Sequence, residues 1–336
     1  MSVLRGTARA TTLWPVVFLL LGLACASSAA QPVSPPEPSG AAPSLCSEEQ
    51  GDLVEYIVGV ERELPKAGST AYADPDIQQA GRLVDALLRL AQGDCEGAVS
   101  LAAPHDLEAV RFVDTRDGGE AHLLLRQRQP CTSACWGLVV LNPKARRAWL
   151  VVEVPHPLFD QETPRFAAEA YLSAGARSLL MASTHRRASC VGEACASDVA
   201  HNPTSLFQRF HEALVDACST VVQYHGFART ADRQDYPEVV LSSGSPVVPG
   251  GLLALRDALV QRGISADTFD GERYRDLGAT TNVQGQQTRN KGATFYHMEH
   301  TIAVRRDAGL RAAAVEALLV AEGTPETREP GGCRGP

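Results

Sequence analysis

The spacing of apolar residues after the first forty-five positions predicts helices. Residues 47–65 and 75–103 carry apolar side chains at helical spacing, and in the second segment Leu83 and Leu87 fall on one face. No linker-like stretch separates these segments from the next part of the chain. We therefore expect a helical N-terminal segment over residues 46–105, packed against the rest of the protein.

From about residue 108 the pattern becomes that of strands. Short apolar or alternating runs are separated by turn-forming residues. These runs predict antiparallel strands at one edge of a sheet. They cover residues 109–113, 121–125, 136–141 and 148–154.

After residue 154, predicted strands and helices alternate. The strands cover residues 178–183, 220–224, 238–242 and 295–305, and the helices cover residues 163–175, 203–217, 250–263 and 309–322. Alternation of this kind predicts an α/β fold with a mixed, largely parallel central sheet flanked by helices. Such a domain would cover residues 106–324 and be followed by a loose tail over residues 325–336.

The first residues are typical of an exported protein. A basic start and an apolar run over residues 13–24 lead to small residues, which predicts a signal peptide over residues 1–30. A flexible linker rich in Pro, Ser and Ala follows over residues 31–45. Alternatively, the leader is a lipoprotein signal and Cys25 carries a lipid anchor. We expect a periplasmic, secreted or lipid-anchored protein of the cell envelope.

The cysteines favour disulfide bonds. The chain has nine cysteines, and eight remain when Cys25 is set aside. An even number in an exported protein is typical of a disulfide framework, whereas the absence of a C-x-x-C motif argues against a cysteine zinc site. Proximity favours two short loops, which leaves two longer pairs: Cys131–Cys135, Cys190–Cys195, Cys46–Cys95 and Cys218–Cys333.

The net charge narrows the range of partners. It is −8 at pH 7, with 21% charged residues in an ordinary globular mixture. An acidic chain gives no reason to expect binding to nucleic acid or to an anionic membrane surface. We expect membrane attachment only through the alternative lipid anchor.

A histidine and a carboxylate follow the end of one predicted strand. His156 lies two residues after the apolar run that ends at Val154, and Asp160 lies four residues later, before a helix opens. The α/β enzymes build their sites at the carboxyl ends of strands. Zinc binds histidine nitrogen and carboxylate oxygen, so His156 and Asp160 can share a metal.

A second predicted strand, residues 220–224, also ends in a histidine. A lone histidine at a strand end is commonly structural, but His225 together with His156 and Asp160 makes a recurrent hydrolytic zinc set. Gly226 follows directly, which would allow a sharp turn and the close approach of a substrate or metal. The histidines could also serve another metal, since imidazole suits several.

A glutamate on the last predicted strand completes the set. Strand alternation puts His297, Glu299 and Thr301 on one face. A carboxylate facing an activated water is the general base that amide hydrolysis needs. The alternative is that Glu299 is an ordinary ion-pair partner of Arg305 or a neighbour.

The order of these features resembles the zinc carboxypeptidase superfamily. The similarity is greatest to its outlying branches, the poly-γ-glutamate hydrolases and N-formylglutamate amidohydrolase-like proteins, and spans roughly residues 148–322. The resemblance implies one zinc ion per chain and hydrolysis of an amide bond. It implies the following roles: His156 as the first zinc ligand, Asp160 as the carboxylate ligand, His225 as the last ligand and Glu299 as the catalytic glutamate.

The chain departs from the superfamily's H-x-x-E motif at Phe159. The carboxylate ligand is therefore displaced to Asp160 or, alternatively, to Glu162. The resemblance also implies that a segment between the zinc motifs binds the substrate. Candidates are Arg186, whose guanidinium can hold a carboxylate, with His201 and Asn202. The alternative for this segment is that Arg186 and Arg187 are solvated and that Asp198 caps the next helix.

The sequence thus predicts an exported zinc-dependent hydrolase of peptide or γ-glutamyl amide bonds, with peptides, γ-glutamyl polymers or peptidoglycan stems as substrates. The departure at Phe159 motivates a different hypothesis. In it the chain is a surface metal-binding or interaction module that keeps the fold without catalysis. A serine or cysteine hydrolase is disfavoured because the chain has no G-x-S-x-G motif.

Overall fold

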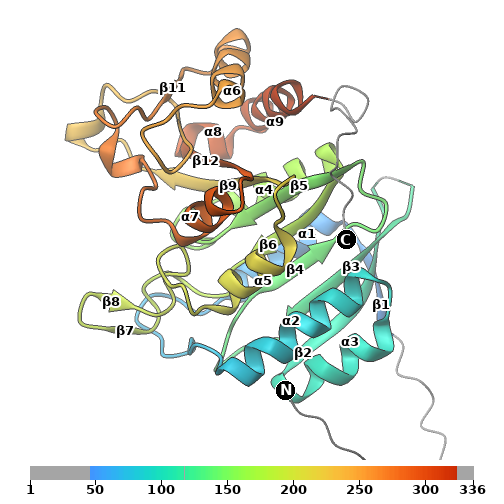
Figure 1. Cartoon of the computed structure of the whole chain (residues 1–336). Coiled ribbons are helices and arrows are strands. Elements are labelled where there is room, and N and C mark those ends of the chain that lie inside the picture. The colour runs from blue at the N-terminus through green and yellow to red at the C-terminus, as the bar shows by residue number, and fades with distance from the viewer. Residues whose placement is uncertain (1–45, 117, 324–336) are drawn as a thin grey trace, which may run out of the picture. The chain divides into compact units, whose positions relative to one another are not determined.

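A computed structural model describes residues 46–116 and 118–323. Its central feature is a sheet in the order β1-β2-β3-β4-β6-β5-β9-β12-β10-β11, with β7 and β8 forming a separate hairpin (Figure 1). The strands are β1 (Ser47–Gly51), β2 (Leu107–Asp114), β3 (Glu120–Gln127), β4 (Leu138–Leu141), β5 (Arg147–Val154), β6 (Ala176–Met181), β7 (Cys190–Val191), β8 (Ala194–Cys195), β9 (Thr220–Phe227), β10 (Val239–Ser242), β11 (Ala266–Thr268) and β12 (Thr294–Thr301).

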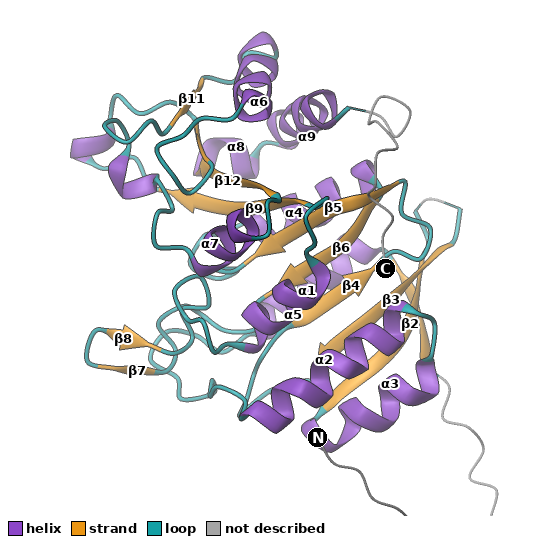
Figure 2. Ribbon diagram, viewed as in Figure 1, coloured by secondary structure: helices purple, strands orange, loops and turns teal. Residues whose placement is uncertain are grey.

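Helices cover both faces of this sheet, as Figure 2 shows. One face packs against α1, α4, α6 and α9, and the other packs against α2, α3 and α5, with α7 beside α5. Their bounds are α1 (Leu53–Glu63), α2 (Ile77–Ala91), α3 (Cys95–Ala102), α4 (Thr163–Ala174), α5 (Leu206–Leu214), α6 (Gly250–Gln261), α7 (Val283–Asn290), α8 (Ile302–Arg306) and α9 (Ala308–Glu322). The result is a three-layer sandwich with one apolar core on each side of the sheet.

The sheet is mixed, and its centre is parallel. Strands β6, β5, β9 and β12 run parallel to one another, and antiparallel pairs flank them on both sides. Central strands buried on both faces read as nearly continuous apolar runs, as Leu150–Val152 and Val221–Val222 do in this chain. The expected α/β class with a mixed, largely parallel sheet and flanking helices is therefore confirmed.

The N-terminal segment differs from the expected pair of helices. Residues 47–51 form a strand that pairs in parallel with β2. The first helix, α1, begins only at Leu53, because the Asp52 side chain caps it by accepting from Val54 N and Glu55 N. The second expected helix is divided in two where Gly93 adopts a φ of 81°. Asp94 then caps α3 through Gly97 N. The first strand is thus part of the main sheet.

The order of the sheet also corrects the expected edge. Strand β5, expected among antiparallel edge strands, lies at the centre between β6 and β9 and is parallel to both. This brings the carboxyl ends of β5, β9 and β12 side by side. In the register of the last two strands, Glu299 lies opposite His225. Residues from three distant parts of the chain therefore meet at one edge.

Disulfides join three of the expected cysteine pairs: Cys46–Cys95, Cys131–Cys135 and Cys190–Cys195. The first ties β1 to the start of α3. The fourth expected pair joins Cys218 to Cys333, and Cys333 lies outside the described residues, as do the expected signal peptide, linker, lipid-anchored Cys25 and C-terminal tail.

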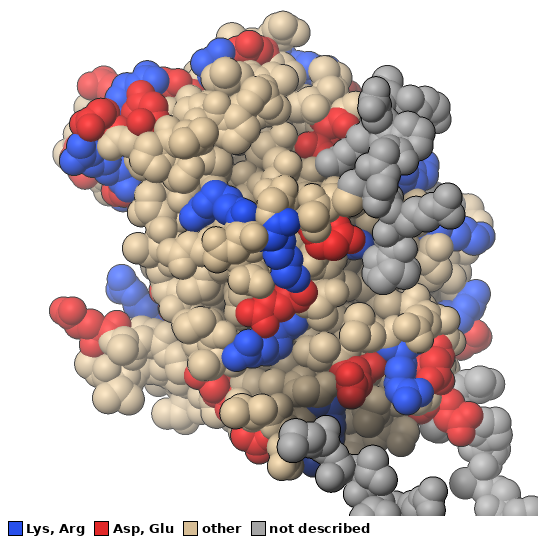
Figure 3. All heavy atoms as spheres, in the orientation of Figure 1, with Lys and Arg blue, Asp and Glu red and all other residues tan. Residues whose placement is uncertain are grey.

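The surface carries charges of both signs. On the face shown in Figure 3, acidic and basic side chains are interspersed. None of the helices in residues 46–116 and 118–323 is both long enough and apolar enough to span a membrane.

Candidate metal centre

A tight turn after β5 brings His156 and Asp160 to the same side. Asp160 N donates to His156 O at 2.9 Å, and the Thr163 hydroxyl donates to Asp160 O at 2.7 Å before α4 begins. Both site side chains are almost fully buried, with 2% and 3% of their surface exposed. Glu162 adopts a φ of 69° and has no part in this pair. Of the two carboxylates left open by the sequence, Asp160 is the one beside His156.

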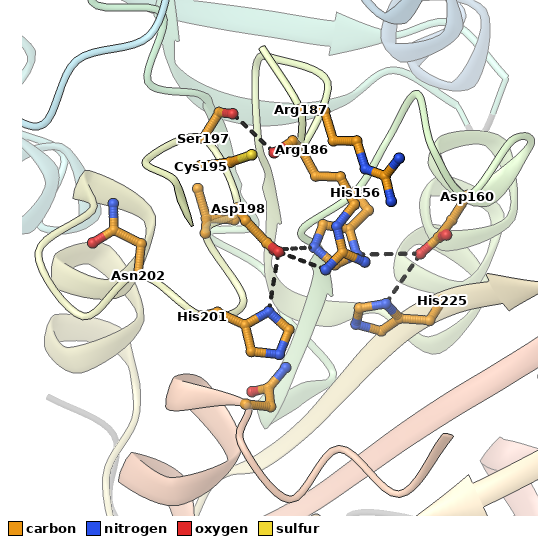
Figure 4. A network of polar contacts seen from close by, with 12 residues as sticks. His156, Asp160, Arg186, Arg187, Cys195, Ser197, Asp198, His201, Asn202 and His225 are labelled. Atoms are coloured by element: carbon orange, nitrogen blue, oxygen red, sulfur yellow. Dashed lines mark hydrogen bonds and ion pairs between the residues drawn. The ribbon is translucent and has the colours of Figure 1, made fainter. Parts of the chain in front are cut away.

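His225 approaches Asp160 from β9, as Figure 4 shows. Asp160 Oδ2 lies 3.0 Å from His225 Nδ1 and 3.5 Å from His156 Nδ1. The two imidazole rings are edge to face, with their centroids 4.9 Å apart. Two histidines and one carboxylate therefore present three potential ligand atoms to one buried point.

The outer nitrogen of each ring is held by another side chain. His156 Nε2 lies 2.8 Å from Asp198 Oδ1, and His225 Nε2 lies 2.9 Å from Gln223 Oε1. Metal-bound histidines typically donate their second nitrogen to such an acceptor, which fixes the ring and its tautomer. Both Nδ1 atoms consequently face Asp160.

Two of the three distances between these atoms fit a small tetrahedral ion. Bonds of about 2.0–2.1 Å at tetrahedral angles separate neighbouring ligand atoms by roughly 3.3 Å. The distances from Asp160 Oδ2 to the two Nδ1 atoms, 3.0 and 3.5 Å, lie on either side of that value. Arg186 Nη1 lies 3.5 Å from His156 Nδ1, so a cationic group already sits beside this point.

Burial and charge shift the protonation of the group. Burial lowers the pKa of His225 to about 4 despite the opposing effect of Asp160. Burial also opposes the charged forms of His156 and Asp160, but their mutual hydrogen bonding outweighs it and raises the pKa of His156 while lowering that of Asp160. An ionised carboxylate and a neutral imidazole are the forms that bind metals.

Glu299 lies on the neighbouring strand with its carboxyl group buried. Burial first, and then the negative charge of Asp160, raise the pKa of Glu299 well above its ordinary value. Its Oε2 has no hydrogen-bond partner, and neither has the buried Nδ1 of His297, whose Nε2 lies 3.7 Å from Glu299 Oε1. His225, His297 and Glu299 form a second group whose atoms could hold a metal.

A pocket of about 720 Å³ opens beside these residues. Its lining includes Asp160, His225 and Glu299 together with a set of arginines: Arg186, Arg229, Arg233 and Arg305. Two of the four have carboxylate partners, because Arg186 pairs with Asp198 at 2.5 Å and Arg233 with Asp276 at 2.6 Å. The wall of the pocket therefore favours anionic ligands.

Gly226 serves a purpose other than the expected turn. It lies within β9, and a Cβ added there would come within 2.2 Å of Arg305 Cζ. The close approach is thus made by the Arg305 guanidinium, which lies against the glycine and donates to Gln161 O. The absence of a side chain at residue 226 makes room for this arginine in the pocket wall.

The candidate substrate-binding residues divide into two sets. Asp198 accepts from Arg186 and lies 3.2 Å from His201 Nδ1, so both candidates join the group around His156. Asn202 lies apart, because its amide donates to Asp74 Oδ1 and Ala196 O, both at 2.7 Å. In Figure 4 the Asn202 side chain points away from His156.

Four residues in or beside the group were given no role there by the sequence. Asp198 was interpreted as a helix cap, and Gln223 lies inside an apolar run. His297 was noted only for sharing a face with Glu299. In the structure its buried Nδ1 has no hydrogen-bond partner, which marks it as a possible ligand. Arg305 was interpreted only as an ion-pair partner. Alternation along β9 is the one sequence signal that links Gln223 to His225.

Comparisons with known proteins give structural matches only. No protein-family model and no curated protein matches the sequence. Solved structures that match include a bacteriophage poly-gamma-glutamate hydrolase (14% identity, TM-score 0.37, covering 55% of this chain and 86% of that one). An aspartoacylase family protein from Mesorhizobium loti matches at 15% identity and a TM-score of 0.37, over 61% and 68% of the two chains.

A metallo-carboxypeptidase from Burkholderia cenocepacia also matches, at 13% identity and a TM-score of 0.32, over 70% and 66% of the two chains. The poly-gamma-glutamate hydrolase and the metallo-carboxypeptidase are of the kinds that the order of site residues resembles. Because each of these TM-scores is below 0.5, the chemistry of the site rests on the residues of this chain alone.

Proposed function

We propose that this chain is an exported zinc-dependent hydrolase of amide bonds. The observation that carries the proposal is the convergence of His156 Nδ1, His225 Nδ1 and Asp160 Oδ2 in a buried group beside a pocket. Two imidazoles and one carboxylate are a donor set that catalytic zinc sites use, and such sites leave a fourth position open.

His156, Asp160 and His225 would hold the ion, one per chain. When bound, zinc supplies Lewis-acid polarisation of the scissile carbonyl and lowers the pKa of a water molecule. The outer hydrogen bonds to Asp198 and Gln223 keep the two rings oriented toward that position.

Glu299 would act as general base and then general acid. Its carboxylate takes a proton from the attacking water and returns it to the leaving amide nitrogen. Burial, and then the negative charge of Asp160, raise its pKa, and a higher pKa makes the carboxylate a stronger base toward the attacking water. The positive charge of a bound ion would act in the opposite direction on the same group.

The arginines of the pocket support a substrate that carries carboxylates. Arg186, fixed by its ion pair with Asp198, is the proposed anchor for one of them. Arg305 lies in the same wall, and no carboxylate within residues 46–116 and 118–323 approaches it within 4 Å. Acidic peptides, γ-glutamyl chains and peptidoglycan stems share this chemistry. Three disulfides fit a protein that works in an oxidising compartment outside the cytoplasm.

The alternative is a non-catalytic module that binds a metal or a partner at the same place. The HPLFD sequence at residues 156–160, which departs from the usual motif, is the observation that favours it. The two functions differ in what Glu299 is needed for, since a module that only binds does not require a base.

The test begins with metal content measured by mass spectrometry on the mature protein, purified with its disulfides. We expect about one zinc per chain, lost in His156→Ala and His225→Ala variants that remain folded. Hydrolysis of γ-glutamyl and acidic peptides by wild type and Glu299→Gln then separates enzyme from module. A wild-type protein that takes up no metal when zinc is supplied would refute the proposed mechanism. Equal product formation by wild type and Glu299→Gln would remove Glu299 as the base.

A further inference from the structure

Arg305 is a buried arginine that faces the pocket of the candidate site. Strand β12 carries Glu299 and ends at Thr301, and the short helix α8 that follows brings Arg305 back to the same pocket. Only 4% of the residue is exposed. An arginine is almost never buried to this extent unless its charge is paired. The contacts of its guanidinium are therefore informative.

The protein uses little of the hydrogen-bonding capacity of this guanidinium. Nη1 donates to Gln161 O, and Nε is buried without a partner. Within residues 46–116 and 118–323, Gln161 O is the one acceptor that the group contacts, and no carboxylate lies within 4 Å of it. A guanidinium carries several N–H donors in a planar fork. Donors thus remain for a ligand in the pocket.

The side chain is nonetheless held in one place. Its guanidinium lies against Gly226, where an added Cβ would come within 2.2 Å of Cζ and 2.6 Å of Nε. The backbone is also fixed, because Arg311 Nη1 donates to Arg305 O at 3.0 Å and Arg311 pairs with Glu169 at 2.7 Å. A cation that is fixed before a ligand arrives loses little freedom on binding. The arrangement is that of a preformed site for an anion.

The other arginines of the pocket already have counterparts for their charge. Arg186 and Arg233 pair with carboxylates at 2.5 and 2.6 Å, and Arg229 is exposed to water. Among the pocket arginines in the described part of the chain, Arg305 alone is buried without a carboxylate partner. A buried charge without a partner is costly to the fold. Stability therefore does not account for this arginine, whereas a carboxylate on a ligand would supply the missing partner.

The guanidinium also lies close to the candidate metal ligands. The two residues that it touches, Gln161 and Gly226, directly follow Asp160 and His225 in the chain. An anion bound to Arg305 would therefore occupy the part of the pocket nearest those ligands. A carboxylate is the anion that peptides carry, and the planar fork of arginine matches its two oxygens.

We propose that Arg305 is a specificity-determining residue that binds a carboxylate of the substrate close to the scissile amide. Arg186 remains the anchor for another carboxylate, so the preferred substrate carries at least two carboxylates near that amide, as γ-glutamyl dipeptides do. Gly226 is a positioning residue, since it acts through Arg305. The inference rests on the proposed function for the reaction, although the carboxylate site itself is a property of the metal-free protein.

The test measures the binding of dipeptides to the metal-free mature protein by isothermal titration calorimetry. The ligands are γ-glutamylglycine and two analogues, each with one of its two carboxylates converted to a carboxamide. Removing one partner of a buried charged pair weakens binding by about 30-fold or more. We expect a loss of this size in wild type when the carboxylate held by Arg305 is amidated.

Arg305→Met removes the guanidinium and keeps the aliphatic part of the side chain. It should bind the unmodified dipeptide more weakly by the same factor, and amidation of that one carboxylate should then have little effect. Arg82→Met is the matched control, because it removes the same charge from an exposed site on α2 that does not line the pocket. It should retain the wild-type affinities for all three dipeptides. Urea unfolding confirms that each protein is folded.

Gly226→Ala provides a second variant, which keeps the charge but displaces the guanidinium. It should lose the same preference for carboxylate over carboxamide. The inference is overturned if Arg305→Met keeps the wild-type preference at both positions or, where that variant does not fold, if Gly226→Ala keeps it. A wild type that binds the three dipeptides equally, or binds none of them, would overturn it as well. Selective binding by a wild type that takes up no zinc and hydrolyses no dipeptide would instead contradict the proposed function and leave the carboxylate site standing.

Discussion

The contact between Gly226 and Arg305 gives the sharpest stability prediction. A Cβ at residue 226 would lie 2.2 Å from Arg305 Cζ, 2.5 Å from Nη1 and 2.6 Å from Nε. Real contacts do not approach this closely, and the guanidinium is held in place with only 4% of the residue exposed. Gly226→Ala must therefore displace Arg305 or the strand beneath it.

Two opposing terms set the size of the effect. Overpacking of a buried site costs typically about 1–3 kcal/mol. Replacing a strand glycine by alanine returns about 0.5–1 kcal/mol, because the unfolded chain loses conformational freedom. The net result for Gly226→Ala is a destabilisation of about 1 kcal/mol, and of about 2.5 kcal/mol at most. In an Arg305→Ala background only the second term remains, so the same substitution should stabilise the protein by about 0.5–1 kcal/mol.

Urea unfolding of the four proteins of this cycle, with disulfides intact, measures the coupling directly. Gly81→Ala is the matched control, since nothing lies within 4 Å of the Cβ position at that exposed site in α2. It should stabilise both backgrounds equally. The reasoning fails if Gly226→Ala costs the same free energy whether or not Arg305 is present.

Three further predictions concern the site and its surroundings. Glu299→Gln should lower kcat/KM by about 10²–10⁴-fold at unchanged zinc content, and a comparable loss of zinc would show that Glu299 is a ligand instead. Asp198→Asn should weaken zinc binding about 10–100-fold by loosening His156, measured by dye competition; unchanged affinity would refute that role. Burial, and then Glu162, raise the pKa of Glu61 to about 7 from 4.5. Wild-type stability should therefore fall as pH rises from about 4.5 to 7, whereas Glu61→Gln should lack this fall in thermal unfolding scans.

Much of the fold could be predicted because its periodicity is strong. The alternation after residue 154 gave β6, β9, β10 and β12 and their helices within a few residues. Residues 47–51 were assigned to a helix because the boundary depends on the Asp52 cap, a local feature that apolar spacing does not reveal. The parallel, central position of β5 depends on long-range pairing with β6 and β9, which no window of sequence contains.

In the candidate site, too, the features marked by local sequence pattern could be predicted, and those that depend on long-range contacts could not. His156 and His225 were noticed because each follows the end of an apolar run, and Asp160 because it lies four residues after His156. Glu299 was noticed on the last predicted strand, and the structure brings all four together. Asn202 was chosen because the resemblance implies a substrate-binding segment there, and its amide donates to Asp74 instead. The role of Gln223 could not be predicted, because the sequence does not show which side chains a polar residue inside a strand will contact.

A chain of buried polar side chains behind His225 is hard to explain by stability alone. Replacing buried ionic and polar groups by apolar residues of similar volume is often neutral or stabilising, so a core needs no Glu153, His211 or Gln223. These residues lie on β5, α5 and β9, and their hydrogen bonds end at one nitrogen of His225. The ring of His225 is held on both sides, since Asp160 Oδ2 lies 3.0 Å from Nδ1 and Gln223 Oε1 lies 2.9 Å from Nε2. The proposed metal site requires a ring held in one orientation, and that requirement accounts for a costly polar chain at this place.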